Sequence, residues 1–549
     1  MSGVRTNPAP AIAGPRHGPT DRLAGWLALW FGVALVAIFQ HGPMPMYSTR
    51  TLAVAWEMWH RHSFLVPYLN GAPYSDKAPL LFWLIHAGWA VTGVGDGWPR
   101  LLEVLLGGLE LVLCLRLARR LFPDRPAAAY AAPLLLMSFS YAFLFGLQSM
   151  YEVLLADCVL AALLALRPGP ADARPNLSGF AAAMAFGLLT KGPVMLLHAG
   201  LPWLLGPLWQ PWAAQHRRRW YATGTLAVLA ALAVLLAWAL SASAVGGEAY
   251  RQQLLLHQTA GRVVDAFAHR QPFWWYLPVL PVLVFPIVLW PRPWLSMPRL
   301  PFRHDDGLRF LVAWLGPVLV GFSLVSGKQA YYLLPEYSGF ALLLAVALAH
   351  APTTATRRLG PWPLALFTLL LGIELLALPT LVAHGTGHSP MVQSFATHSR
   401  DFGVAFVLLA VLLATRGAEL EKIVLSALLG VLVINTLFTL TWWHAFDLNQ
   451  ASAVLAKAEA EGRPIFNNEG YNGQFTFAGR LTRPIDEAAG PVALRQWAAA
   501  HPQGVVVTYP KTEAEARGCP ALQVQRFRGV WLAIRPAAAY LPLATPLCP

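Results

Sequence analysis

Charged residues are scarce in this sequence. Only 12% of its 549 residues are charged, and 56% are apolar, whereas about a quarter of the residues in a soluble globular domain carry charge. Several apolar runs approach or exceed about 20 residues, the length of a helix that crosses a bilayer. Because a backbone inside lipid must satisfy its own hydrogen bonds, the sequence predicts an all-α polytopic membrane protein and excludes an ordinary soluble domain.

Cysteine is also rare, and its spacing argues against a cysteine-based metal site. Two cysteines fall inside apolar spans and two in the C-terminal segment, with no CxxC pair among them: Cys114, Cys158, Cys519 and Cys548. If the C-terminal segment lies outside the cytoplasm, Cys519 and Cys548 are candidates for a disulfide.

Other common signals are missing as well. The sequence has no internal repeat and no phosphate-binding glycine loop. The first apolar span, near 25–40, does not end in a small-residue cleavage site, so we expect a first membrane helix and not a signal peptide. The polar, Pro- and Gly-rich residues 1–23 before it are predicted to be a disordered cytoplasmic N-terminus.

Positive charge is in excess, with 40 Lys and Arg against 27 Asp and Glu and a net charge of +13. No basic patch shows the aromatic interleaving that single-stranded nucleic acid needs, so we expect no nucleic-acid partner. The arginines instead gather in alternate loops between apolar spans, as the positive-inside rule predicts for an inside N-terminus. Thirteen spans fit this pattern, at about 24–40, 99–121, 126–147, 150–167, 177–192, 194–210, 220–243, 273–291, 308–326, 331–350, 361–383, 401–415 and 421–443.

An outer loop, residues 41–98, follows the first span. Its amphipathic run 49–61 favours a helix on the outer membrane surface. The apolar run 79–92 is only about 14 residues long, which is short for a crossing. We interpret it as an interfacial or re-entrant helix; as an ordinary span it would invert the predicted topology downstream.

The composition changes after the last span. Charged residues recur through residues 444–549, with helix-like runs at 451–461 and 493–500 and short β-rich runs at 504–509 and 530–534. We therefore expect a transmembrane domain over residues 24–443 and a small periplasmic α/β domain over residues 444–549.

Unusual polar residues fall at the ends of apolar spans. In the predicted topology they all lie on the face away from the cytoplasm: Asp76, Lys77, Glu152, Lys191, His269 and Lys328. Charge beside lipid is costly, so its convergence on one membrane face predicts a functional site there.

Several motifs accompany these residues. They are Tyr74-Ser75-Asp76-Lys77, Tyr151-Glu152, Thr190-Lys191-Gly192-Pro193, His269-Arg270, and Phe322-Ser323 followed by Lys328 and Tyr332-Leu333-Leu334-Pro335. Together, over roughly residues 25–350, they resemble the family-39-like membrane glycosyltransferases, which include protein O-mannosyltransferases and the lipid A aminoarabinose transferase. The resemblance implies the C-type glycosyltransferase fold, a polyprenyl-phosphate-linked sugar donor and transfer on the extracytoplasmic face.

The resemblance also implies roles for individual residues. Glu152 stands where the family has an Asp, and a carboxylate there can act as general base. Arg50, Lys191 and Lys328 would stabilise the charge on the leaving phosphate, with the donor also held by Lys77, Tyr74, Tyr332 and Arg270. Asp76 and His269 match positions that can hold a divalent metal ion. The competing interpretation is that the lysines only snorkel at helix ends.

The sequence departs from the family at one place. An Asp-Glu pair normally begins the surface helix of the first outer loop, and here the positions are Tyr47-Ser48 while Arg50 remains. Four interpretations follow: Glu152 acts alone as the base, Glu57 replaces the missing Asp from the same helix, the acceptor needs little activation, or the protein is a non-catalytic relative.

A transporter or flippase for a lipid-linked sugar is the main rival hypothesis, since Glu103, Glu110 and Glu374 fall inside spans and such acids can mark ion paths. The absence of repeats favours the enzyme. We therefore predict an inner-membrane glycosyltransferase that moves a sugar to an envelope acceptor, lipid A or lipopolysaccharide first and protein second. The residues leave open whether the transfer inverts or retains.

Overall fold

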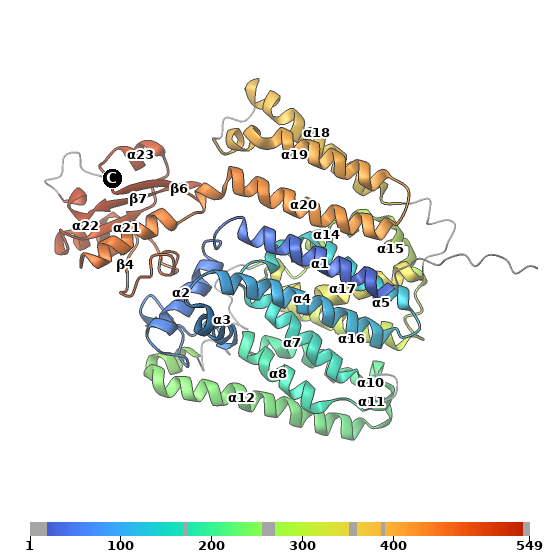
Figure 1. Ribbon diagram of the computed structural model, residues 1–549. Coiled ribbons are helices and arrows are strands. Elements are labelled where there is room, and N and C mark those ends of the chain that lie inside the picture. Colours follow the sequence, from blue (N-terminus) through green and yellow to red (C-terminus); the bar gives the residue numbers. More distant parts are fainter. Residues whose placement is uncertain (1–18, 168–173, 255–269, 351–359, 386–389, 542–549) are drawn as a thin grey trace, which may run out of the picture.

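The computed structural model describes residues 19–167, 174–254, 270–350, 360–385 and 390–541 of the chain. Figure 1 shows a large helical region with a smaller sheet-containing domain at one end of it. The described chain ends in that domain. Three predictions fall on residues outside these ranges: most of the N-terminal segment (residues 1–18), the metal-ligand candidate His269 and the disulfide candidate Cys548.

Long apolar helices make up most of the helical region. Seven helices among the described residues are long and apolar enough to cross a membrane, or eight if the bent pair α5–α6 is one span. The chain is therefore a multi-pass membrane protein, as predicted. The main helices are α1 (Pro19–Phe39), α4 (Gly97–Leu121), α5 (Pro126–Ser138), α6 (Ser140–Gly146), α12 (Arg217–Gln252), α16 (Asp306–Leu324), α17 (Tyr337–Ala349), α18 (Trp362–Ala383), α19 (Pro390–Ala414) and α20 (Glu419–Thr441).

Several of the thirteen predicted spans are short or interrupted in the structure, among them 126–147, which bends by 63° between α5 and α6. Two are the compact helices α7 (Tyr151–Leu166) and α8 (Leu177–Lys191). The predicted span 194–210 is divided into η1 (Leu196–Gly200), α9 (Leu201–Leu204) and α10 (Gly206–Trp209), and 273–291 into α14 (Tyr276–Leu283) and η3 (Ile287–Leu289). Proline begins α9 and α10 and lies within α14, and proline interrupts helical hydrogen bonding, which explains these breaks.

The outer loop folds into two helices and a hairpin. They are α2 (Ser48–His60), β1 (Tyr68–Leu69), β2 (Ala72–Pro73) and α3 (Leu80–Thr92). Asn70 and Gly71, both with positive φ, form the two-residue turn that this dipeptide favours. With 13 residues, α3 is too short to cross a bilayer by itself, in keeping with the predicted interfacial or re-entrant helix.

The C-terminal domain contains a five-stranded mixed sheet in the order β4-β3-β5-β7-β6. Val505 and Val507 face one apolar cluster and Val506 faces another, so the central strand is buried on both sides. The four predicted runs correspond to α21 (Asn449–Ala460), α22 (Pro491–Ala500), β5 (Val505–Thr508) and β7 (Val530–Pro536). The sequence did not predict β3 (Ile465–Asn467), β4 (Asp486–Glu487), α23 (Glu513–Arg517) and β6 (Gln523–Phe527). Cys519 is disulfide-bonded, and its predicted partner lies outside the described residues.

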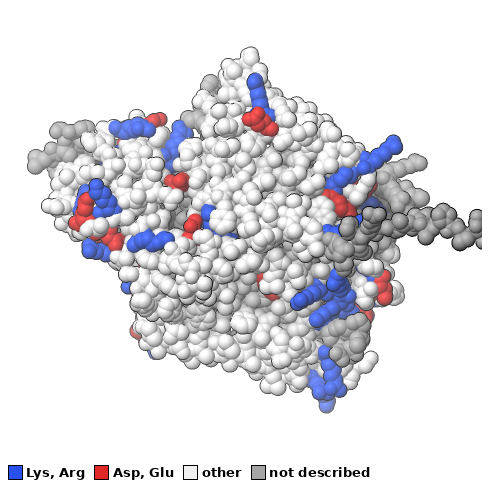
Figure 2. All heavy atoms as spheres, in the orientation of Figure 1, with Lys and Arg blue, Asp and Glu red and all other residues white. Residues whose placement is uncertain are grey.

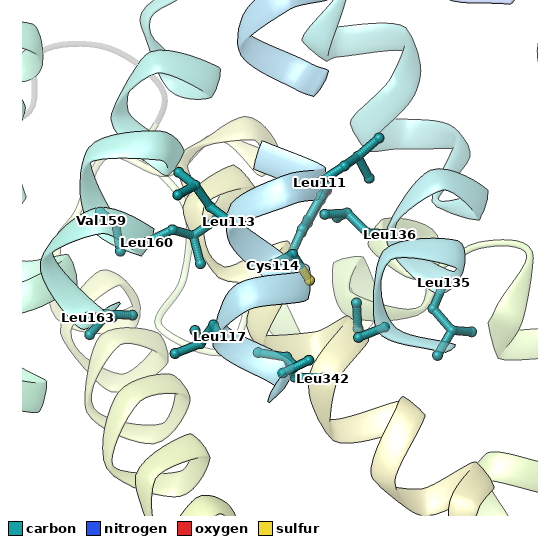
Figure 3. Close-up of a cluster of buried hydrophobic side chains, with 14 of the residues drawn as sticks. Leu111, Leu113, Cys114, Leu117, Leu135, Leu136, Val159, Leu160, Leu163 and Leu342 are labelled. Atoms are coloured by element: carbon teal, nitrogen blue, oxygen red, sulfur yellow. The ribbon is translucent and has the colours of Figure 1, made fainter. Parts of the chain in front are cut away.

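Apolar packing places α7 at the centre of the helical region. Figure 3 shows side chains of α4, α5, α7 and α17 meeting around Cys114. In the apolar span Ala330–Ala349, which contains α17, 72% of the residues are buried within the protein, whereas in the α18 span only 17% are, so α18 lies at the periphery. Because α7 is held in this core, its first residues at the end of the bundle have a fixed position.

Charge separates the two ends of the helical region. Figure 2 shows few charged side chains across the middle of this face; they gather on the sheet domain at one end and near α10, α11 (Pro211–Gln215) and the start of α12 at the other. An uncharged band between two charged ends is the pattern of a membrane-spanning protein.

Candidate active site

An ion pair joins the ends of α7 and α8. Lys191 Nζ lies 2.7 Å from Glu152 Oε1, and the exposed fractions of the two side chains are 14% and 4%. Glu152 is in the first turn of α7, where the helix dipole favours an acid. Lys191 is the last residue of α8, which ends because Gly192 adopts a φ of 71° and Pro193 follows. The Thr-Lys-Gly-Pro motif thus ends the helix at Lys191 and fixes the position of its side chain.

The rings of two tyrosines, Tyr331 and Tyr332, lie beside this pair. Lys191 Nζ lies 4.8 Å from the ring centre of Tyr332 and 5.9 Å from that of Tyr331, within the range of cation–π attraction. Both tyrosines belong to η5 (Ala330–Glu336), the tight helical segment before α17. The structure therefore brings three predicted site residues together, namely Glu152, Lys191 and Tyr332, and adds Tyr331.

The outer loop supplies a second group of side chains around Tyr151. Lys77 Nζ lies 5.2 Å from the Tyr151 ring centre. Arg50, Tyr74 and Glu152 are all close enough to interact electrostatically with the Tyr151 hydroxyl. The start of α2 is tied to this region because the amide of Ser149 donates to Ser48 Oγ at 3.2 Å. Arg50, Lys77 and Tyr74 thus surround the residue that precedes Glu152.

Lys328 is bound to backbone carbonyls. Its Nζ donates to the carbonyl oxygens of Gln271 and Val325 at 3.0 and 2.5 Å, and only 3% of the residue is exposed. The same two loops pair where Arg270 bridges to Gly327. These contacts give Lys328 a loop-joining position. Its predicted catalytic role and the predicted donor contact of Arg270 stay predictions.

A metal site is not assembled by the described residues, in which no group of three or more His, Cys, Asp and Glu side chains is arranged to hold an ion. Asp76 lies exposed between β2 and α3. Its predicted co-ligand His269 is outside the described residues. With one of the two proposed ligands described, no reaction step is assigned to a metal ion here.

Glu57 has a structural position in the loop. Its carboxylate accepts hydrogen bonds from the amides of Asn70 and Gly71 at 2.6 and 2.8 Å, so it supports the hairpin turn. Burial raises the pKa of Glu57 above its ordinary value, while the two amides and Arg61 oppose the rise. Because both carboxylate oxygens are engaged, Glu57 is a poor substitute for the missing Asp. Tyr47 instead approaches Tyr141 and Tyr331.

Buried acids lie deeper between α4 and α7. Glu103 is close enough to Glu152 to interact with it, and Asp157 lies near both Glu103 and Glu110. Glu110 accepts a hydrogen bond from Ser338 Oγ at 3.1 Å. Sequence reasoning placed Glu103 and Glu110 inside a membrane span but did not connect them to Glu152. Their relation to α7 depends on packing, which local sequence does not reveal.

Comparison with known proteins identifies similar sequences. Residues 76–238 match the family described as dolichyl-phosphate-mannose-protein mannosyltransferase. The undecaprenyl phosphate-alpha-4-amino-4-deoxy-L-arabinose arabinosyl transferase 2 of Pseudomonas fluorescens is 31% identical over 355 residues, 59% of each chain. The corresponding transferase of Pseudomonas paraeruginosa is 34% identical over 376 residues, 65% of this chain and 64% of the relative. The chain thus matches about 59–64% of the length of these relatives.

Solved structures show the same fold. ArnT from Cupriavidus metallidurans bound to undecaprenyl phosphate superposes with a TM-score of 0.72 at 21% identity, covering 93% of this chain and 98% of that one. Its apo state gives a TM-score of 0.73 at 19% identity over the same shares. The resemblance predicted from the motifs is confirmed by the matching family and by the fold.

Proposed function

We propose that this chain is an integral membrane glycosyltransferase that moves a sugar from a polyprenyl phosphate to lipid A. The observation that carries the proposal is the buried Glu152–Lys191 pair beside Tyr332, at the end of the bundle where the outer loop packs. The curated relatives are named as undecaprenyl-phosphate aminoarabinose transferases, which favours a pentose donor of that class and a lipid A or lipopolysaccharide acceptor over protein hydroxyls.

The geometry supports a direct role for Glu152 in proton transfer. An acceptor hydroxyl attacks the anomeric carbon of the donor sugar, and the bond from that carbon to the phosphate oxygen breaks. The hydroxyl proton passes to the Glu152 carboxylate, and the polyprenyl phosphate leaves with the bonding electron pair. The ion pair with Lys191 and the nearby outer loop support assigning to Glu152 the role that the absent Asp has in the family.

Cations near Glu152 would stabilise the departing phosphate. Lys191 lies in the pair itself, and Arg50 and Lys77 lie around Tyr151. A fixed positive charge aimed at a developing anion lowers the barrier more in a water-poor site than in bulk water. Tyr74 and Tyr332 would bind the donor sugar or phosphate, with Arg270 and Lys328 on the adjoining paired loops.

The membrane placement follows from the same arrangement. Exposed apolar residues on α12 and α18 offer a lipid-facing surface along which a polyprenyl tail can lie. We propose a bacterial inner-membrane location with Glu152 and the sheet domain on the periplasmic side. We also propose that Asp76 and His269 bind a divalent ion, to which no reaction step is assigned. Measuring the rate of sugar transfer after treatment with a chelator tests this proposal.

Mass spectrometry of envelope lipids tests the function. Lipids are compared from cells lacking the protein, cells with the wild type and cells with Glu152→Gln. We expect a sugar-sized mass on lipid A in the wild type that both other strains lack. If the deletion loses that mass but Glu152→Gln keeps it, the base assignment is wrong. If lipid A is the same in all three strains, the acceptor assignment fails, and a transporter or a non-catalytic relative becomes the better interpretation.

A further inference from the structure

A cavity lies where the membrane helices meet the sheet domain, and Glu152 is not among its lining residues. Its volume is about 370 Å³, within the range of about 300–1,000 Å³ found for small-ligand sites. Ser394 of α19 and Trp442 at the end of α20 form one wall, and Lys511, Arg526 and Trp531 of the domain form the other. Ser394 Oγ donates to the carbonyl of Thr441 at 3.0 Å and so ties the two membrane helices together there.

The lining combines cations with aromatic rings. Arg526 lies 5.2 Å from the ring centre of Trp531, so its guanidinium is held beside an indole face. Lys511 is exposed, and Trp442 and His444, from the segment that follows α20, line the same cavity. The acid in the lining, Glu513, accepts a hydrogen bond from Arg517 at 2.8 Å, which partly neutralises it. Aromatic faces bind the apolar faces of sugar rings, and paired cations bind phosphate.

The position of the cavity selects for a lipid headgroup. Trp442 follows the last residue of the membrane helix α20, at the level where aromatic residues mark the membrane surface. A segment of one helical turn, η7 (Trp443–Ala445), separates the cavity from a smaller hollow lined by Trp443, Asp447 and Thr49. Thr49 is the neighbour of Arg50 on α2. The cavity therefore adjoins, through η7, the loop that carries predicted site residues.

We propose that this cavity binds the phosphorylated saccharide headgroup of a glycolipid and so anchors the acceptor while its hydroxyl is presented at Glu152. Binding of the headgroup requires no sugar transfer. That the bound glycolipid is the acceptor rests on the proposed function. Lys511 and Arg526 would hold a phosphate, and Trp442 would contact the sugar.

Binding and transfer are measured separately on the full-length protein in neutral detergent. The probes are bis-phosphorylated lipid A, dephosphorylated lipid A, phosphatidylglycerol and inorganic phosphate, each titrated by calorimetry. The variants are Lys511→Glu and the double variant Lys511→Glu/Arg526→Glu. Arg495→Glu on α22 is the matched control, since it makes the same charge change on an exposed residue of the same domain outside the cavity.

We expect bis-phosphorylated lipid A to bind about tenfold more weakly to the double variant and about threefold more weakly to Lys511→Glu, with Arg495→Glu unchanged. Lys511 is exposed, so the single variant should fold even if loss of the Arg526–Trp531 contact disturbs the double variant. Equal binding of phosphatidylglycerol or inorganic phosphate would overturn the saccharide class. Unchanged lipid A affinity in both variants would overturn the site.

Transfer kinetics separate this inference from the proposed function. In the cavity variants the KM for the acceptor should rise while kcat and the KM for the donor stay near wild type. If the wild type binds lipid A but transfers no sugar, the proposed function fails and the binding site stands. If the wild type transfers sugar and the cavity variants keep its acceptor KM, the function stands and the binding site is wrong.

Discussion

Lys191 at the end of α8 lies 2.7 Å from Glu152 at the start of α7, and both side chains are nearly inaccessible to solvent. Each charge is compensated mainly by the other, because burial removes the water that would otherwise solvate it. The pair therefore contributes both to the stability of the fold and to the proposed chemistry, and substitutions can separate these two contributions.

Substitution of Lys191 should lower the stability of the fold. In Lys191→Met the Glu152 carboxylate is left buried without its cation, which we expect to destabilise the protein by about 3–5 kcal/mol. Adding Glu152→Gln to the same protein should recover most of the thermal stability but none of the transfer activity. Apparent Tm in detergent and transfer rate, measured on both variants, check this.

The Arg292–Glu419 pair provides the control for that experiment. It has a similar contact, 3.1 Å, but its side chains are 23% and 19% exposed and it lies apart from Glu152. We expect Arg292→Met to cost about 1 kcal/mol or less and to leave transfer intact. Equal losses of stability and activity in both lysine and arginine variants would contradict a special role for the Lys191–Glu152 pair.

Lys328 distinguishes a loop-joining role from a catalytic one. Its ammonium donates to two carbonyls from separate loops, so Lys328→Met leaves two part-buried acceptors without their donor and should lower the free energy of unfolding by about 0.5–1.5 kcal/mol. If the contacts define its main role, transfer by the folded fraction should fall less than tenfold. A fall in kcat of about a hundredfold with unchanged Tm would instead support the catalytic role predicted from the motif.

A buried hydrogen bond positions the segment that carries Tyr331 and Tyr332. His198 Nδ1 lies 2.7 Å from Glu336 Oε1, with both side chains fully buried. Glu336 is the last residue of η5, so loss of this contact should make the positions of Tyr331 and Tyr332 beside Lys191 less fixed. We expect His198→Leu to lower Tm and to raise the donor KM, whereas Glu336→Gln, which can still accept from the imidazole, should keep both closer to wild type. A donor KM that is unchanged in His198→Leu would contradict the positioning role.

Glu57 gives a pH-dependent prediction. Its pKa is raised from the ordinary value of 4.5 by burial. A carboxyl whose pKa is higher in the folded state contributes most to stability below its unfolded pKa, and this contribution is lost as pH rises through the folded pKa. The Tm advantage of the wild type over Glu57→Gln should therefore shrink between about pH 4 and about pH 7. An advantage that grows over this interval would show that the Asn70 and Gly71 amides outweigh burial.

Sequence patterns predicted the elements that depend on local chemistry. The end of α8 at Lys191 follows from Gly192 and Pro193, and the turn at Asn70-Gly71 follows from the conformations that these residues prefer. The surface helix, the short apolar helix and two of the five strands of the C-terminal sheet, β5 and β7, were predicted for similar local reasons. The family motifs also brought Glu152, Lys191 and Tyr332 into one group before any distance was known.

Other features depend on contacts between distant segments, which no local pattern contains. The loop carbonyls around Lys328 and the engagement of Glu57 by the hairpin amides are set by tertiary packing. The broken helices at 194–210 have prolines in the sequence, yet the apolar composition alone predicted one span. Tyr331 stands beside a predicted residue, but its approach to Lys191 appears only when η5 is folded.

The central claim is that Glu152 accepts a proton during sugar transfer. The most direct measurement is the single-turnover rate of transfer from an undecaprenyl-phosphate-linked aminopentose to lipid A by purified wild type and Glu152→Gln, with Tm measured on both. We predict that Glu152→Gln, which keeps a hydrogen-bond acceptor for Lys191, folds but transfers about 10²–10⁴-fold more slowly. A folded Glu152→Gln protein that transfers sugar at the wild-type rate would contradict the account.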